Sequence, residues 1–113
     1  MKKHENIIIS KIVCEFTDYL LNHNFNEVTT KIITSDLETI ITIETMSIND
    51  DLLVLINEHL LQKRDAYLEL EGSSLVGEGD YFHIVGSLID EHEILNQTNK
   101  TIFILKRKVV NLF

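Results

Sequence analysis

The sequence predicts an α+β fold, a two-layer sandwich in which helices cover one face of a mixed, mostly antiparallel β-sheet. Two observations support this prediction. In three segments, apolar residues recur at spacings of three and four, which is typical of amphipathic helices. In two neighbouring segments, β-branched residues alternate on either side of a short polar turn, which indicates paired strands. The order helix–strand–strand–helix–helix–strand favours helices packed on one side of a sheet.

The first helix is expected over residues 4–23. Its apolar stripe consists of Ile9, Ile12, Val13, Phe16 and Leu20, widened by Ile8 and Leu21. Asn22 and Asn24 predict its end, because asparagine tolerates the left-handed conformation that often follows a helix. We interpret the wide apolar face at its start as a candidate dimer or partner surface. That face comprises Ile7, Ile8, Ile9 and Ile12.

Two strands are expected next, at residues 27–34 and 39–46, with a polar turn at 35–38 between them. So short a connection makes the pair antiparallel. In the second strand Ile41 and Ile43 face one side and Glu44 faces the other, because successive side chains alternate.

The remaining chain is expected to return helices to the sheet and to add one last strand. A second helix is expected over residues 50–63, capped by Asn49 or Asp50. Its apolar stripe consists of Leu52, Leu55, Ile56 and Leu60, widened by Leu53 and Leu61. Residues 66–71 fit either a short strand or a continued helix, and both alternatives stay open.

The glycine-rich segment 72–79 is expected to be a loop, because glycine gives the backbone its greatest freedom there. A third helix follows over 80–91, with four residues pointing inward: Tyr81, Val85, Leu88 and Ile89. A polar loop is expected at 91–100, and the last strand at 101–108.

Composition favours a single domain, residues 1–113, with 44% apolar residues to form a core. The sequence has no apolar run of about 18 residues and no signal-peptide pattern, so we expect neither a membrane span nor a leader. Cys14 is the only cysteine, which excludes an internal disulfide and favours a cytoplasmic location. We expect Cys14 to be buried, and its neighbours Glu15 and Asp18 to disfavour a thiolate.

The charge distribution argues against a nucleic-acid partner. The net charge is −8, and residues 32–99 carry fourteen acidic side chains but only two basic ones. Such a surface repels phosphates. We interpret the basic cluster at 106–108 as a solvated strand end and not as a phosphate site.

No metal site is predicted. The histidines are His4, His23, His59, His83 and His92, and no two of them have the i, i+4 spacing of a helical zinc site. His92 lies in an acidic run, which we interpret as a solvated helix end. His83 lies between Phe82 and Ile84 and is expected to be a helix-surface or half-buried residue and not a base.

Four segments, in order, resemble the ATP-binding domain of the histidine-kinase-like (GHKL) ATPases, which include sensor kinases and anti-sigma-factor kinases. In that family a helix with an acidic residue and an asparagine precedes two strands, the second ending in Asp-x-Gly. A Gly-x-Gly loop, a helix and a strand beginning near Gly-Thr follow. The matching segments here are residues 15–23, 41–47, 77–79 and 100–104, so the resemblance spans about residues 9–108.

The departures from the family pattern imply a vestigial nucleotide site. Tyr19 stands where the family has the asparagine that ligates Mg²⁺, and Thr45 stands where it has the aspartate that binds the adenine amino group. Ser47 replaces the glycine that lets backbone approach the base. Only Gly77 and Gly79, in the Gly-x-Gly loop, match.

The leading hypothesis is therefore a cytoplasmic, non-catalytic regulatory or protein-interaction domain on a degenerate scaffold of this family. It would need no cofactor and would act through a protein partner or as a homodimer. The alternative is a divergent ATP-binding protein kinase of the anti-sigma-factor or sensor-kinase type, using ATP and Mg²⁺. Glu15 matches the family's water-activating residue and would then be catalytic. A third possibility is an unrelated α+β binding domain.

Overall fold

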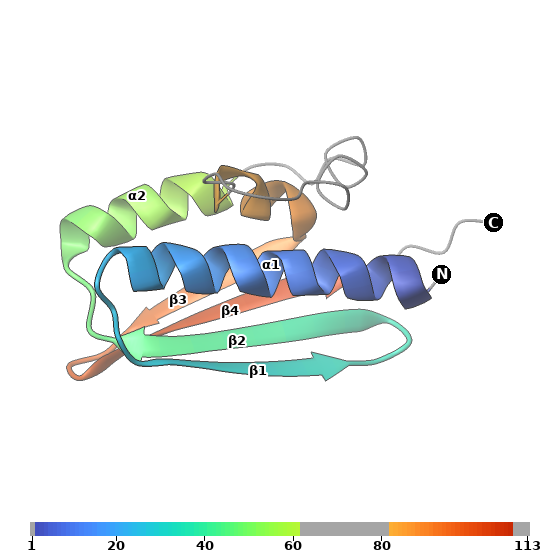
Figure 1. The fold of residues 1–113 in the computed structure, drawn as a ribbon, viewed down its shortest axis with the longest axis horizontal. Helices are drawn as coiled ribbons and strands as arrows, with labels where there is room; N and C mark the ends of the chain where they lie inside the picture. The colour runs from blue at the N-terminus through green and yellow to red at the C-terminus, as the bar shows by residue number, and fades with distance from the viewer. Residues whose placement is uncertain (1, 62–81, 110–113) are drawn as a thin grey trace.

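A computed structural model describes residues 2–61 and 82–109 (Figure 1). The helices and strands are, in order, α1 (Lys2–Asn22), β1 (Val28–Thr34), β2 (Glu38–Met46), α2 (Asp50–Leu60), the 3₁₀ helix η1 (Phe82–Leu88), β3 (Glu91–Asn96) and β4 (Lys100–Lys108). The two glycines of the Gly-x-Gly segment and the ambiguous residues 66–71 lie outside the described residues. The α+β class predicted from sequence is confirmed.

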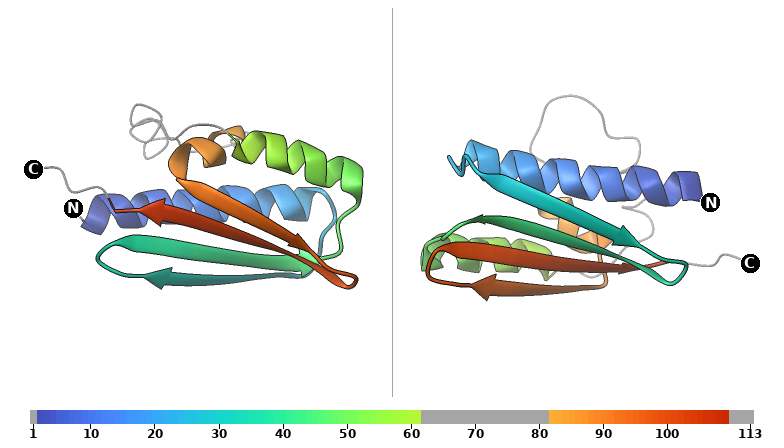
Figure 2. Two further views of the ribbon diagram at one scale, coloured as in Figure 1. Left: turned by 180° about the vertical axis from the view of Figure 1, so that it is seen from behind. Right: turned by 90° about the horizontal axis from the view of Figure 1, so that it is seen from below.

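The four described strands form one open sheet in the order β1-β2-β4-β3, and every pairing among them is antiparallel. The expectation of a mixed sheet was therefore wrong. The sheet consists of two hairpins placed side by side, and a hairpin can only join antiparallel strands. Helices α1 and α2 and η1 lie on one face of the sheet (Figures 1 and 2).

α1 is amphipathic as predicted, and it packs most of its apolar stripe on the sheet. Ile8, Ile12 and Phe16 are fully buried in the core. Because this face packs against the chain's own sheet, it cannot serve as the partner surface expected at Ile7, Ile8, Ile9 and Ile12. Of these four residues only Ile7 is exposed.

The predicted helix end at the asparagines is confirmed. Asn24 adopts a positive φ of 68°. The N–H of Phe25 bonds to the carbonyl of Leu20, and the N–H of Asn24 bonds to that of Leu21, both at 3.0 Å. This pattern is the Schellman motif, in which one left-handed residue satisfies the last helical carbonyls and turns the chain. It directs the chain from α1 back into β1.

The β1–β2 hairpin has the predicted position and alternation. The N–H of Ser35 bonds to the carbonyl of Glu38 at 2.9 Å, and Ser35 Oγ accepts from the N–H groups of Leu37 and Glu38. Val28 pairs with Thr45, which sets the register. The side chains that face the helices from β2 are all buried, namely Thr39, Ile41, Ile43 and Thr45.

α2 begins at the predicted cap, because Asn49 Oδ1 accepts from the N–H of Leu52 at 2.9 Å. Ile56 and Leu60 are buried as predicted, but Leu55 and Leu61 are exposed. The buried stripe of α2 is therefore narrower than predicted. The helix packs closely against η1. A Cβ added to Gly86 of η1 would collide with the backbone carbonyl of His59.

Two predictions for the second half of the chain were wrong. The expected third α-helix over 80–91 is a short 3₁₀ helix in its described part, although Val85, Leu88 and Ile89 are buried as predicted. The expected polar loop at 91–100 instead contains β3, which pairs antiparallel with β4. The turn between the two strands is closed by a bond from the N–H of Gln97 to the carbonyl of Lys100. Glutamates and a histidine alternate along β3, so its apolar content is too low to signal a strand.

The basic cluster was also misinterpreted. Arg107 is 1% exposed and forms a two-point ion pair with Glu5 of α1, with Nε–Oε1 at 3.0 Å and Nη2–Oε2 at 2.6 Å. Its Nη1 donates to the carbonyl of Leu88 at 2.8 Å. Arg107 points to the helix side because it shares a strand face with Phe103 and Leu105. Lys108, in contrast, is exposed.

Candidate functional site

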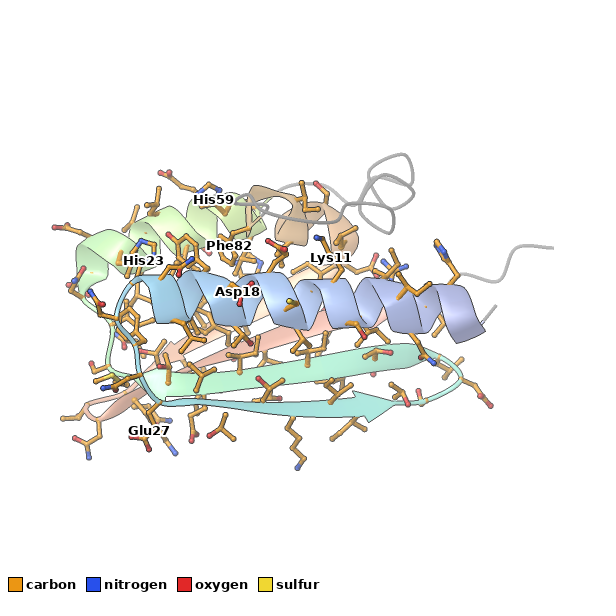
Figure 3. All side chains as sticks on the ribbon, in the orientation of Figure 1. Lys11, Asp18, His23, Glu27, His59 and Phe82 are labelled. Atoms are coloured by element: carbon orange, nitrogen blue, oxygen red, sulfur yellow. The ribbon has the colours of Figure 1, made fainter. Side chains whose placement is uncertain are left out.

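Glu15 and Tyr19, the two α1 residues singled out by the resemblance, lie on one helix face with Lys11 and with His23, which follows the end of the helix. Lys11, Glu15, Tyr19 and His23 follow one another at intervals of four, so their side chains lie one above the other. The ring contacts of Tyr19 with His59 and Phe82 show that this face is directed toward α2 and η1. His59 and Phe82 are labelled in Figure 3. We refer to Lys11, Glu15, Tyr19 and His23 as the α1 stripe.

Aromatic rings fill the space between the α1 stripe, α2 and η1. Tyr19 is 7% exposed and stacks on Phe82, with ring centroids 4.0 Å apart and planes at 18°. Phe82 in turn makes edge contacts with Phe16 and with His59 of α2. The His23 ring lies 4.3 Å from that of Tyr19, and its Nδ1 carries the hydrogen that bonds to the Tyr19 carbonyl at 2.8 Å. Tyr19 thus serves as a packing residue at the position aligned with the metal ligand.

Glu15, the residue aligned with the family's base, is shielded from solvent and paired. Its carboxylate lies 3.1 Å from Lys11 Nζ, one turn earlier, and both side chains are largely buried. The carboxylate is held along the helix surface by this ion pair. A role as a base would require that pair to be exchanged for a bound water.

Thr45 and Ser47 occupy the end of β2. Thr45 lies on the helix-facing side with Ile41 and Ile43, and its hydroxyl donates to the Glu27 carbonyl at 2.8 Å. This confirms that the alternation places Thr45, and not Glu44, on the face turned to the helices. Glu44 lies on the other face, 3.2 Å from Lys100. Ser47 is exposed just beyond the strand.

The structure places the end of α1 and the end of β2 at the same end of the molecule (Figure 1). Tyr19 contacts rings of α2 and η1, whereas the Thr45 hydroxyl bonds to Glu27. Gly77 and Gly79 lie outside the described residues, so the described site consists of the helix and strand contributions.

Two other candidate residues lie where sequence reasoning did not expect them. His92 is in β3 and not at a helix end, and its Nε2–H donates to Asn57 Oδ1 of α2 at 2.7 Å. Partial burial lowers the pKa of His92 below its ordinary value. Cys14 is exposed on α1 and not buried. Desolvation, and then the Asp18 and Glu15 carboxylates, raise the pKa of its thiol, which agrees with the expected lack of a thiolate.

Sequence reasoning missed the aromatic partners of Tyr19. Phe82 and His59 come from segments far from α1 in the sequence, and nothing in the local pattern links them. The i, i+4 pair of Tyr19 and His23 was a usable signal, because such a pair on a helix often stacks. In the described part of the chain, no group of three or more metal-binding side chains is gathered.

Comparison with known proteins gives no match, whether against family models, curated proteins or solved structures. No helix within residues 2–61 and 82–109 has the length and apolar character needed to span a bilayer.

Proposed function

We propose that this chain is a non-catalytic regulatory or protein-interaction domain built on a degenerate histidine-kinase-like ATPase scaffold. The observation that carries the proposal is the buried stack of Tyr19 on Phe82. In the family pattern the Tyr19 position supplies a metal ligand. Here the ring is enclosed by α1, α2 and η1, so its space is taken up by packing.

The state of Thr45 supports the same proposal. Where the family has a carboxylate acceptor for adenine, this chain has a hydroxyl that donates to its own backbone at Glu27. Loss of a charge-assisted hydrogen bond costs about 1.5–3 kcal/mol of binding free energy. With the metal ligand and the close-approach glycine also replaced, by Tyr19 and Ser47, we infer that no ATP or Mg²⁺ is bound.

The order of described elements also supports the scaffold. A helix, a hairpin and a helix precede η1 and the last strand, as in the resemblance, with β3 as an added member. The acidic middle of the chain favours a protein partner or a second copy over nucleic acid. The single cysteine favours action in the reducing cytoplasm.

The alternative function is a divergent ATP-binding protein kinase of the anti-sigma-factor or sensor-kinase type. One observation favours it: Glu15 lies one turn from Tyr19 on the same face of α1, largely shielded from solvent. In that case Glu15 would be the catalytic residue, and ATP with Mg²⁺ the cofactor pair.

Isothermal titration calorimetry of the full chain with ATP and Mg²⁺ separates the two functions. We expect the dissociation constant for ATP to be weaker than about 1 mM, which corresponds to a binding free energy weaker than about −4 kcal/mol. A dissociation constant tighter than about 10 μM, roughly −7 kcal/mol, would reject the proposal. The matched variant is Glu15→Gln. Phosphoryl transfer by the natural chain that disappears in Glu15→Gln would establish the alternative.

A further inference from the structure

The two edges of the sheet differ in how they are protected. Figure 2 shows β1 at one edge and β3 at the other. β3 carries two glutamates and a histidine in six residues, and such charges discourage pairing with another strand. β1 reads Val-Thr-Thr-Lys-Ile-Ile-Thr, with one charge and neither proline nor glycine. Among the described strands, only β1 combines an open edge with strongly β-forming side chains.

The turn bond of the first hairpin shows which backbone groups of β1 are available. Ser35 and Glu38 form a hydrogen-bonded pair at the turn. In an antiparallel ladder such pairs alternate, so the odd-numbered residues from 29 to 33 bond to β2. The N–H and C=O groups of Val28, Thr30 and Ile32 therefore point away from the sheet, toward the open edge.

The side chains of this edge are exposed on both faces. Ile33, on the helix-free face, is 51% exposed, and Ile32, on the helix-facing side, is still 45% exposed. α1 therefore leaves the outer part of β1 uncovered. An unpaired strand with apolar side chains accessible on both faces is a template for adding a further strand.

We propose that β1 pairs antiparallel with β1 of a second copy, with Thr30 on the two-fold axis, so that two four-stranded sheets form one continuous sheet. In this register Thr30 lies opposite Thr30 of the second copy, and Val28 lies opposite its Ile32. All three are positions whose backbone groups face the open edge, so about six interchain hydrogen bonds form.

Charge and hydrogen bonding together select this register. With Thr29 on the axis, Lys31 would lie directly opposite Glu27 of the second copy. However, Ile32 would then lie opposite Asn26, beyond the end of β1, so fewer hydrogen bonds would join the two strands. With Lys31 on the axis, two lysines would lie directly opposite each other, which is destabilising.

With Thr30 on the axis, Lys31 lies opposite Thr29 of the second copy, with its Glu27 on one diagonal and its Lys31 on the other. Glu27 is exposed, and a long lysine side chain spans a diagonal separation of about 7–8 Å. The symmetry produces this Lys31–Glu27 pair twice.

This inference names the second copy as a partner, but it stands independently of nucleotide binding. Binding of ATP would reject the proposed function and leave the dimer intact. A monomeric chain would reject the dimer and leave the lost nucleotide site unaffected.

The first test is the molar mass of the full chain by light scattering after size exclusion, at about 1–100 μM. We expect a dimer that dissociates on dilution. Thr30→Pro removes an N–H that faces the open edge and breaks no bond to β2, a position where proline is tolerated. We expect it to weaken dimerisation more than tenfold. Circular dichroism and thermal melting confirm that the variant folds.

The second test does not depend on proline. Lys31→Glu places a new carboxylate near Glu27 of the second copy, and Glu27→Lys places two lysines together. We expect each single change to weaken the dimer about fivefold to tenfold and the double exchange to restore it. Within one chain the two residues are four positions apart on an extended segment, beyond direct contact.

Each outcome decides the proposal. A dimer lost in Thr30→Pro and restored by the double charge exchange supports it. A monomeric natural chain at about 100 μM would overturn it and assign the edge to a strand from a different protein. A dimer insensitive to all these changes would overturn it too, because the copies would then meet elsewhere.

Discussion

The two hairpins of the sheet differ in the contacts that hold them in place. The β1–β2 hairpin is closed by bonds within its own turn. Ser35 Oγ accepts from the N–H groups of Leu37 and Glu38, and the N–H of Ser35 donates to the carbonyl of Glu38.

The β3–β4 hairpin is also closed at its turn, by the bond from the N–H of Gln97 to the carbonyl of Lys100. Its side chains reach the helices as well: Arg107 pairs with Glu5 of α1, and His92 bonds to Asn57 of α2. The second hairpin therefore adds contacts with distant partners to the local bonds that both hairpins have.

The largest expected effect comes from breaking the ion pair that ties β4 to α1. Glu5→Gln leaves the Arg107 guanidinium, 1% exposed, without its carboxylate. Removing one partner of a buried pair costs about 3–5 kcal/mol in the free energy of unfolding. We expect a loss near the lower end of that range, because part of the Glu5 side chain remains solvent-accessible. Urea denaturation monitored by circular dichroism measures it.

The matched control is Glu44→Gln on the first hairpin. Glu44 also pairs with a cation of β4, Lys100 at 3.2 Å, but the two side chains are 41% and 45% exposed. Exposed pairs of this kind contribute at most about 1 kcal/mol. Equal losses for the two variants would show that the second hairpin does not depend on its contact with α1.

This difference between the hairpins explains how much of the fold could be predicted. The turn and alternation of residues 27–46 predicted the first hairpin correctly, because short-range signals determine both. β3 could not be predicted because only two of its residues, Ile94 and Leu95, are apolar. It forms a strand because it pairs with β4, and the local sequence does not show that pairing. The sequence predicts a solvated Arg107, and this prediction is wrong because the residue that pairs with it, Glu5, lies at the other end of the chain.

The candidate site divides in the same way. The inward face of Thr45 follows from the alternation of the strand, and the structure has it as expected. Glu15 was expected on a polar face of the helix, but it is buried, and so is Tyr19. The stacking of Tyr19 on Phe82 could not be predicted, since it requires knowing that η1 returns to α1. Cys14 was expected inside, but it lies on the exposed flank of the α1 stripe. A cysteine one position from Val13 gives no signal of its own.

A second comparison uses two threonines that lie opposite each other, Thr45 in β2 and Thr101 in β4. Thr45 makes one hydrogen bond, to the Glu27 carbonyl. Thr101 donates to Asn96 Oδ1 at 2.8 Å and accepts from the N–H of Ile48 at 3.1 Å. Both side chains are buried, so substitution by valine removes the bonds with little change in shape.

We expect Thr101→Val to lower the free energy of unfolding by about 2 kcal/mol and Thr45→Val by about 1 kcal/mol. The larger cost arises because the Ile48 N–H would be left buried without its acceptor. Denaturant titration of both single variants measures the difference. A greater loss of unfolding free energy for Thr45→Val than for Thr101→Val would contradict this prediction. It would show that the hydrogen bond of Thr45, in the first hairpin, contributes more to stability than the two bonds of Thr101.

The smallest expected effect concerns pH. Burial lowers the folded-state pKa of His92, whereas in the unfolded chain it stays near about 6.5. Between the two values the unfolded state binds more protons, so stability falls as pH decreases through about 6.5 toward the folded-state pKa. His92→Gln retains an amide donor for Asn57 but does not titrate. We expect the natural chain to lose more stability than this variant between about pH 7.5 and 5.5, measured by urea denaturation. The first hairpin, residues 28–46, contains no histidine. Identical pH profiles for the natural chain and His92→Gln would show that the second hairpin is no more sensitive to pH than the first.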